Sequence, residues 1–188
     1  MSDLFVDNIK HQSSQGSGTI TLGASGETVS LASGASQTMA VNTPAFEVIK
    51  SSDQTVSDGS TTKITFDTEI FDTASAYDTS TSKFTVPSAQ AGKYFIYSGL
   101  THNSTTSGQI SDSRTIIYKN GSSHKGSFLI FGGNTGFYLS LNTYSIIDLS
   151  VGDYIEVYGL INVGSGTAQV QGNTGDNRTY FGGYKIIE

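Results

Sequence analysis

The sequence predicts an all-β fold, a two-sheet sandwich or jelly roll preceded by a short extended segment. Short runs of alternating apolar and polar residues recur through residues 46–188, and clusters of Gly, Asn, Asp and Ser separate them. No segment carries the sustained apolar spacing that an amphipathic helix requires. About ten short strands at this spacing are typical of a sandwich or jelly roll.

The first 44 residues differ in composition from the rest of the chain. Of the 10 Phe and 10 Tyr residues only Phe5 precedes Phe46, and Glu27 is the one formally charged residue between positions 12 and 45. This change places a boundary near Pro44. We therefore expect three parts: an anchor segment at 1–16, a short β-repeat shaft or linker at 17–44, and a head at 45–188.

Within the second part, residues 19–22 (Thr-Ile-Thr-Leu) and 28–31 (Thr-Val-Ser-Leu) form a nine-residue near-repeat. Each unit reads as a short strand, but four residues bury too little apolar surface to offset a backbone ordering cost of about 1–2 kcal/mol per residue. Three copies wound as a triple-stranded β-prism would supply the missing contacts. The side chains expected at that axis are Ile20, Leu22, Val29 and Leu31. A flexible Gly/Ser linker is the alternative.

Strand patterns then follow one another to the end of the chain. They cover residues 46–50, 62–71, 83–86, 93–100, 114–119, 126–131, 136–142, 145–149, 154–162, 168–171 and 179–187. Asn120-Gly121 lies between two apolar runs and predicts a two-residue hairpin turn.

Three blocks of the head carry a family resemblance. The first is Phe71–Phe95, with Tyr-Asp, a Lys-Phe-Thr strand, Pro and Gly-x-Tyr-x-Phe. The second is Ser140–Val157, with Leu-x-x-Gly-Asp, and the third is Thr179–Ile187. In this order they resemble the globular head of the first complement component and its tumour-necrosis-factor-like relatives. That resemblance implies a ten-stranded jelly roll that forms tight trimers. The chain departs from the pattern at residues 73–75, where Thr-Ala-Ser replaces Asn-x-Gly, and it has no Trp.

A trimer also suits the surplus of aromatic side chains in the head, which exceeds what two thin sheets need inside. We expect some of these residues to face neighbouring copies, the alternative being that they fill the core of one protomer. The interface candidates are Tyr94, Phe95, Tyr97, Tyr138, Tyr154, Tyr158 and Tyr184.

The opening residues carry a second resemblance. Ser2–His11, followed by Gly18–Leu22, is similar to the N-terminus of many tailed-phage virion proteins, which implies an anchor that binds other virion proteins. The start shows no basic flank followed by an apolar core, so we expect synthesis in the host cytoplasm and a final location in the virion.

Composition argues against several other classes of protein. The net charge is −6 and the 10 Lys and Arg residues are scattered singly, which disfavours nucleic acid as a partner. The apolar runs are far shorter than the roughly 20 residues that span a bilayer, so we expect no membrane insertion. The chain has no Cys, which excludes disulfides and thiolate metal sites.

The sequence also gives little support to catalysis. His11, His102 and His124 form no spaced metal-binding pair, and no nucleophile motif of the Gly-x-Ser-x-Gly type occurs. Asp67 and Glu69 share a strand face and could serve a glycosidase, but two acids on an exposed face are usually solubilising. We expect a protein that is not an enzyme.

No cofactor is expected. Calcium remains an option, since relatives of this fold sometimes hold it, but no dense oxygen-ligand motif is present. The available loop acids are Asp72, Asp78, Asp112 and Asp176. Binding residues usually sit in loops on a rigid sandwich. The surface-recognition candidates are His102, His124, Arg178 and Tyr180.

Together these observations favour a non-enzymatic bacteriophage virion protein, a trimeric fibre or capsid decoration protein whose head is exposed for host-surface adhesion. The alternative is a carbohydrate-binding module or a bacterial extracellular adhesin with the same head, binding a host glycan or protein. A hydrolase using Asp67 and Glu69 is a third, weaker reading.

Overall fold

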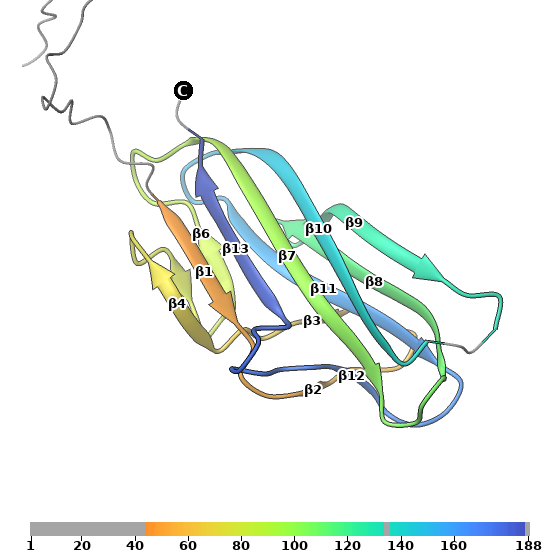
Figure 1. Ribbon diagram of the computed structural model, residues 1–188. Coiled ribbons are helices and arrows are strands. Elements are labelled where there is room, and N and C mark those ends of the chain that lie inside the picture. The colour runs from red at the N-terminus through yellow and green to blue at the C-terminus, as the bar shows by residue number, and fades with distance from the viewer. Residues whose placement is uncertain (1–43, 134–135, 187–188) are drawn as a thin grey trace, which may run out of the picture. The chain divides into compact units, whose positions relative to one another are not determined.

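The structure is a computed structural model that describes residues 44–133 and 136–186. Within them the chain is all-β, with 13 strands in two antiparallel sheets packed as a sandwich (Figure 1). The predicted anchor (1–16), most of the predicted shaft (17–44) and the axis candidates Ile20, Leu22, Val29 and Leu31 lie outside the described residues. No helix in the described part of the chain is long and apolar enough to cross a membrane.

One sheet is built around its long central strand, and we call it the β7 sheet. Its strands follow the order β10–β7–β13–β1–β4, and β12 and β2 continue it beside the C-terminal part of β7. Their bounds are β10 (Tyr138–Leu149), β7 (Gly92–Ser104), β13 (Tyr180–Lys185), β1 (Ala45–Ile49), β4 (Thr68–Asp72), β12 (Ala168–Val170) and β2 (Gln54–Thr55).

The other sheet, which we call the β11 sheet, has the order β9–β8–β11–β6–β5, and β3 pairs with β11 beyond β6. Its strands are β9 (Ser122–Ile130), β8 (Ile110–Lys119), β11 (Tyr154–Val163), β6 (Lys83–Thr85), β5 (Tyr77–Asp78) and β3 (Thr62–Lys63). Strands β9 and β10, the edges of their respective sheets, lie on the same side of the sandwich (Figure 1).

Alternation of side chains along each strand builds the core. On β7, Tyr94 and Ile96 are buried between the sheets, whereas Phe95 and Tyr97 point to the opposite face. Aromatic rings fill the centre: Phe46 stacks on Phe84 with centroids 4.4 Å apart and meets Phe181 edge-on at 5.0 Å. The first and last strands of the head are thus held together in one core.

The predicted fold class is confirmed, and several strand boundaries differ from prediction. Residues 136–142 and 145–149 belong largely to one strand, β10, because buried Thr143 continues the alternation and its hydroxyl donates to the Thr115 carbonyl at 2.9 Å. Residues 62–71 contain two strands, β3 and β4, separated by a segment whose Ile64 and Phe66 are fully buried. The Asn120-Gly121 hairpin between β8 and β9 is confirmed.

Candidate functional site

The outer face of the β7 sheet, turned away from the core, carries a broad apolar surface. Strand register puts side chains of four strands on this face, since Tyr97 lies opposite Tyr144 and Gly182, and Phe95 lies opposite Ile146 and Tyr184. On the far edge, Phe71 shares the face through its pairing with Glu47. We call this surface the aromatic face: Phe71, Phe95, Tyr97, Tyr144, Ile146, Tyr180 and Tyr184.

The rings of the aromatic face contact one another across the strands. Phe95 lies 6.0 Å from Tyr97, 6.3 Å from Tyr144 and 5.6 Å from Tyr184, measured between ring centroids. Tyr97 continues the series to Tyr180 at 6.2 Å. These spacings fall in the range of interacting aromatic pairs, so the rings form one continuous layer.

Two glycines let tyrosine rings lie close against the sheet. A Cβ atom on Gly182 would stand 2.5 Å from the Tyr97 Oη, and one on Gly99 would stand 2.6 Å from the Tyr180 Cζ. Any larger residue at either position would therefore displace the ring above it. The hydroxyls are held as well: Tyr97 donates to the Glu47 carboxylate at 2.7 Å, and burial with this bond raises the pKa of Tyr97.

Much of this apolar surface is open to solvent. The exposed fraction is 66% for Tyr144, 61% for Ile146 and 45% for Phe71. Single exposed apolar residues are common in soluble proteins, but contiguous patches of this kind mark sites of interaction. The aromatic face is therefore the candidate functional site.

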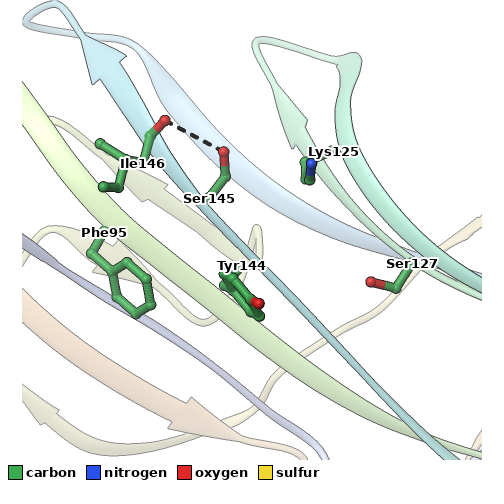
Figure 2. Close-up of a pocket in the computed structure, with 6 residues that line it drawn as sticks. All are labelled: Phe95, Lys125, Ser127, Tyr144, Ser145 and Ile146. Carbon is green, nitrogen blue, oxygen red and sulfur yellow. Dashed lines mark hydrogen bonds between the residues drawn. The ribbon is translucent and has the colours of Figure 1, made fainter.

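A groove opens beside the aromatic face, between β10 and β9. Its volume is about 520 Å3, and Figure 2 shows the residues that line it: Phe95, Lys125, Ser127, Tyr144, Ser145 and Ile146. Phe95, Tyr144 and Ile146 belong to both surfaces, so the groove continues the aromatic face around the edge of the sandwich. Lys125 is exposed and supplies the cationic group of the groove.

Further along the same edge lies a second group of exposed apolar side chains. On β9, Phe128 is 70% exposed and Ile130 is 59% exposed. Where β10 begins, Phe137 and Tyr138 are also exposed, and their ring centroids lie 4.3 Å apart. By register Phe128 and Ile130 share the outer face of the β11 sheet with Arg114 and Asp112, whereas Tyr138 shares the outward side of β10. Exposed apolar residues therefore border the β9–β10 edge on both of its sides.

The predicted interface candidates fall in three places. Phe95, Tyr97 and Tyr184 lie on the aromatic face, and Tyr138 lies further along the same side of β10. Tyr154 and Tyr158 lie on β11, where Lys83 packs over the Tyr154 ring and Tyr158 pairs with Tyr118. Contact of these six residues with a neighbour stays a prediction.

The prediction for Tyr94 is wrong. Its ring is fully buried in the core of the protomer, and its hydroxyl donates to the Gln90 carbonyl at 2.6 Å. Burial raises the pKa of Tyr94 to about 12. The alternation of side chains along β7 could have revealed this error, because the neighbouring residues Tyr94 and Phe95 cannot both face outward.

The surface position predicted for His102 is also wrong. The strand β7 extends to Ser104 and places His102 at an inward position, where the side chain is fully buried. Its Nδ1 forms a hydrogen bond with the Ser113 hydroxyl, and burial lowers the pKa of His102 to about 3. The sequence did not reveal the buried position of His102, because the predicted strand ended at residue 100 and the polar residues 101–104 resemble a loop.

The other three recognition candidates are accessible. His124 is exposed on β9, with its Nε2 3.4 Å from the Ser145 hydroxyl beside the groove. Arg178 pairs with Asp176 and donates to the Gln171 side chain at 2.9 Å. Tyr180 belongs to the aromatic face and donates to Asn142 at 3.1 Å. Binding by these residues stays a prediction.

Asp67 has a structural role in this fold. Its carboxylate accepts hydrogen bonds from the buried Lys50 ammonium at 3.1 Å and the Ser51 backbone N–H at 2.9 Å. Burial alone would raise the pKa of Asp67, but the bonds from Ser51 and Lys50 lower it. A carboxyl held ionised in this way is a poor general acid, which weakens the glycosidase reading of Asp67 and Glu69.

The four acids considered for calcium bond to groups close to them in the sequence, and Asp112 lies in β8 rather than in a loop. Asp72 accepts from the Tyr77 backbone N–H at 2.7 Å, and Asp78 accepts from the Ser80 and Thr81 hydroxyls. Asp112 and Asp176 pair with arginines two residues further along, Arg114 and Arg178. In the described part of the chain no three His, Cys, Asp or Glu residues gather as metal ligands.

Comparison with known proteins identifies the fold. No protein-family model matches the sequence, and no curated protein matches it significantly. The globular domain of a zebrafish complement 1qA protein superimposes with a TM-score of 0.53 at 15% identity, over 77% of this chain and 98% of that one. Eiger TNF from S. frugiperda gives 0.54 at 11% identity, over 77% and 93%. The predicted complement/tumour-necrosis-factor-like jelly roll is therefore confirmed as a fold.

Proposed function

We propose that this chain is a non-enzymatic structural protein of a bacteriophage virion, a homotrimer that serves as a fibre or decoration protein. Its N-terminal segment anchors it to other virion proteins, and its jelly-roll head is exposed for adhesion to the host surface. Its proposed function is assembly and adhesion, not catalysis.

The observation that carries the assembly part is the aromatic face. A layer of interacting rings that includes Tyr144, 66% exposed, is expensive to leave in water, at about 25 cal/mol per Å2 of apolar surface. A stable protein–protein interface normally buries at least about 1,000 Å2. Coverage by other copies of the chain removes this surface from water without requiring a different partner.

A threefold ring also fits the presence of two neighbouring apolar surfaces. In a closed trimer each contact joins two different surfaces, one from each copy, because the rotation that relates neighbours is not a twofold. The aromatic face and the β9–β10 edge, which Phe128 and Ile130 border from the outer face of the β11 sheet, provide such a pair. The sequence resembles complement and tumour-necrosis-factor-like heads, a family that forms trimers. This resemblance supports a trimer rather than another oligomer.

The virion part rests on the sequence of residues 2–22. This segment is similar to the N-termini of tailed-phage virion proteins, and it lies outside the described residues. Imaging purified particles with an antibody raised against residues 46–188 tests it. Label at one defined position on the particle is the expected result, and absence of the protein from particles would refute the virion role.

Sedimentation of the full chain tests the trimer. At micromolar concentration we expect a species of three times the 19.8 kDa chain mass. Tyr144→Arg places a charge in the aromatic face and should shift the protein to monomer, since an unpaired charge in a buried interface costs several kcal/mol. Val151→Arg is the matched control, because Val151 is 52% exposed on the turn after β10 and lies outside the aromatic face.

A wild-type chain that sediments as a monomer would refute the trimer. So would a Tyr144→Arg variant that folds, by circular dichroism, and still sediments with the wild-type mass at every concentration tested. Equal effects of Tyr144→Arg and Val151→Arg would show that the aromatic face has no special part in assembly.

A carbohydrate-binding role is the second candidate. Tyr180 and Tyr97 lie close over glycines, and Asn142 and Glu47 supply polar groups at the ring edges, an arrangement that suits stacking on a sugar. Because the same surface cannot be buried by neighbours and open to sugar, a glycan array separates the two. Saturable binding that Tyr180→Ala abolishes favours the lectin reading.

A further inference from the structure

Glu47 is a carboxylate set within the aromatic face. Strand β1 pairs it with Gly182 on one side and Phe71 on the other, so its side chain shares their face. It is half-buried and accepts a hydrogen bond from the Tyr97 hydroxyl at 2.7 Å. Among residues 44–133 and 136–186, none forms an ion pair with Glu47.

Covering the aromatic face would take this charge out of water. A buried carboxylate with one hydrogen bond from a neutral hydroxyl is poorly compensated, and removing a charge from water costs several kcal/mol unless a cation approaches. A neighbour that covers Glu47 must therefore bring a positive group to the same place. The choice of cation identifies the surface that does the covering.

Most cations of the described chain already have an acidic partner in their own protomer. The pairs are Lys50 with Asp67, Lys63 and Lys83 with Glu156, Lys119 with Asp153, Arg114 with Asp112, and Arg178 with Asp176. These ion pairs include neither Lys125 nor Lys185. Lys185 is half-buried and donates to the Gln90 side chain, whereas Lys125 is exposed and lines the groove between β9 and β10. Lys125 is therefore the candidate cation at the β9–β10 edge.

The β9–β10 edge is also the second surface that a closed trimer requires. Lys125 lines the groove with Tyr144 and Ile146, whereas the exposed Phe128 lies on the opposite side of β9, on the outer face of the β11 sheet. Figure 2 shows the Lys125 side chain among the groove residues. Lys125 is a cation in a groove that three apolar side chains help to line, and Glu47 is an anion among the rings of the aromatic face. The two surfaces therefore complement each other in charge.

We propose that Lys125 of one copy forms an ion pair with Glu47 of the next, so that the β9–β10 edge of each protomer covers the aromatic face of its neighbour. The occupant of the face is thus a second copy, docked by its edge. This inference rests on the trimer proposed above and specifies which surfaces meet in it.

Charge exchange in the full chain tests the pairing. Glu47→Lys and Lys125→Glu each place like charges together, and each should raise the concentration at which the trimer dissociates by at least about tenfold in analytical ultracentrifugation. The double variant Glu47→Lys/Lys125→Glu should return it to within about threefold of the wild-type value. Glu69→Lys is the matched control, since Glu69 is an exposed acid on β4 and should change it little.

A second double-mutant cycle, with neutral substitutions, tests the same pairing in case the charge-reversed variants do not fold. Glu47→Gln keeps an oxygen to accept the Tyr97 hydroxyl, and Lys125→Met keeps an unbranched apolar chain. Each alone leaves a buried charge unpaired and should weaken the trimer, whereas the double variant removes both charges and should be tighter than either single variant.

The outcomes separate this pairing from the trimer itself. A monomeric wild type overturns both proposals. A trimeric wild type in which the two single effects simply add, in both cycles, overturns the pairing and leaves the trimer standing. Rescue of Lys125→Glu by Glu69→Lys rather than by Glu47→Lys would also overturn it, because the contact would then be with the β4 edge.

Discussion

His102 is a neutral imidazole held between the two sheets. Its Nδ1 is bonded to the Ser113 hydroxyl, and its Nε2 is buried with no hydrogen-bond partner within the described residues. A second proton on the ring would make it a buried charge without a counter-ion. The native state therefore favours the neutral ring, and burial lowers the pKa of His102 to about 3.

This pKa predicts a loss of stability in mild acid. An unfolded histidine has a pKa of about 6.5, so below pH 6.5 the unfolded chain binds a proton that the folded chain refuses, down to about pH 3. The stabilisation is complete above pH 6.5. Between pH 7 and pH 5 the free energy of unfolding should fall by about 2 kcal/mol. Denaturant unfolding at fixed protein concentration, followed by circular dichroism, measures it.

His102→Leu supplies the control, because leucine fills a similar volume and does not titrate. Its free energy of unfolding should change much less between pH 7 and pH 5, even if the variant is less stable overall. Identical pH slopes for wild type and variant would contradict the assignment. Carboxylates such as Asp78 and Asp153, each with a pKa of about 2 set by hydrogen bonds, release their stabilisation only at lower pH.

Glycine has a positional meaning on the aromatic face. Gly99 and Gly182 occupy outward positions of β7 and β13, where the rings of Tyr180 and Tyr97 cross them. Glycine weakens a strand because it adds backbone freedom and no side chain. The neighbouring rings compensate by covering the exposed backbone, so each glycine and its tyrosine act together.

At the scale of single elements, the β8–β9 hairpin has the most specific local geometry. Asn120 and Gly121 both have positive φ, 50° and 75°, as a type I′ turn requires. Asn120 is also bonded to the turn between β10 and β11, since its Nδ2 donates to Asp153 at 2.7 Å and its Oδ1 accepts from the Tyr154 backbone N–H at 2.9 Å. The turn thus aligns β9 and β11 on either side of β8.

Gly121→Val should destabilise this hairpin. A β-branched residue at a φ of 75° is strained by about 1–3 kcal/mol, and the free energy of unfolding should fall by that amount. Gly132→Val is the control, because a Cβ there meets nothing within 4 Å and Gly132 has no positive φ. If thermal and denaturant unfolding show equal losses for both variants, turn geometry is not the cause.

The edge strands β9 and β10 are elements that natural proteins usually protect. Their free backbone groups and exposed Phe128 and Ile130 would invite unspecific association in an isolated protomer. Lys125 and His124 on β9 add polarity but leave the apolar residues open. Coverage of this edge by a neighbouring copy would remove the liability.

At the scale of the whole molecule, assembly should appear as concentration-dependent stability. Three copies that bind only when folded stabilise one another by mass action. The melting temperature of the full chain should rise with protein concentration, while that of a folded, monomeric Tyr144→Arg variant should not. Differential scanning calorimetry over a hundredfold range of concentration measures both. A wild-type melting temperature that is independent of concentration would contradict assembly.

Much of the fold could be predicted from local pattern. Alternation along residues 93–100, the Asn120-Gly121 turn and the ordered blocks from Phe71 to Ile187 led to an all-β jelly roll, because these signals act over a few residues and report which side of a strand is buried. The placement of Tyr154 and Tyr158 on the opposite sheet from Phe95 needed the strand order, which alternation does not contain.

The sequence by itself determined the strands, the turns and the identity of the aromatic residues, since backbone propensity and side-chain period are local properties. Only the tertiary structure decided that Tyr94 and His102 face the core, that Phe71 joins rings from three other strands, and that Glu47 stands among them. The reason is physical: burial depends on which strands become neighbours, and residues up to about 140 positions apart are brought together only when both sheets close over one core.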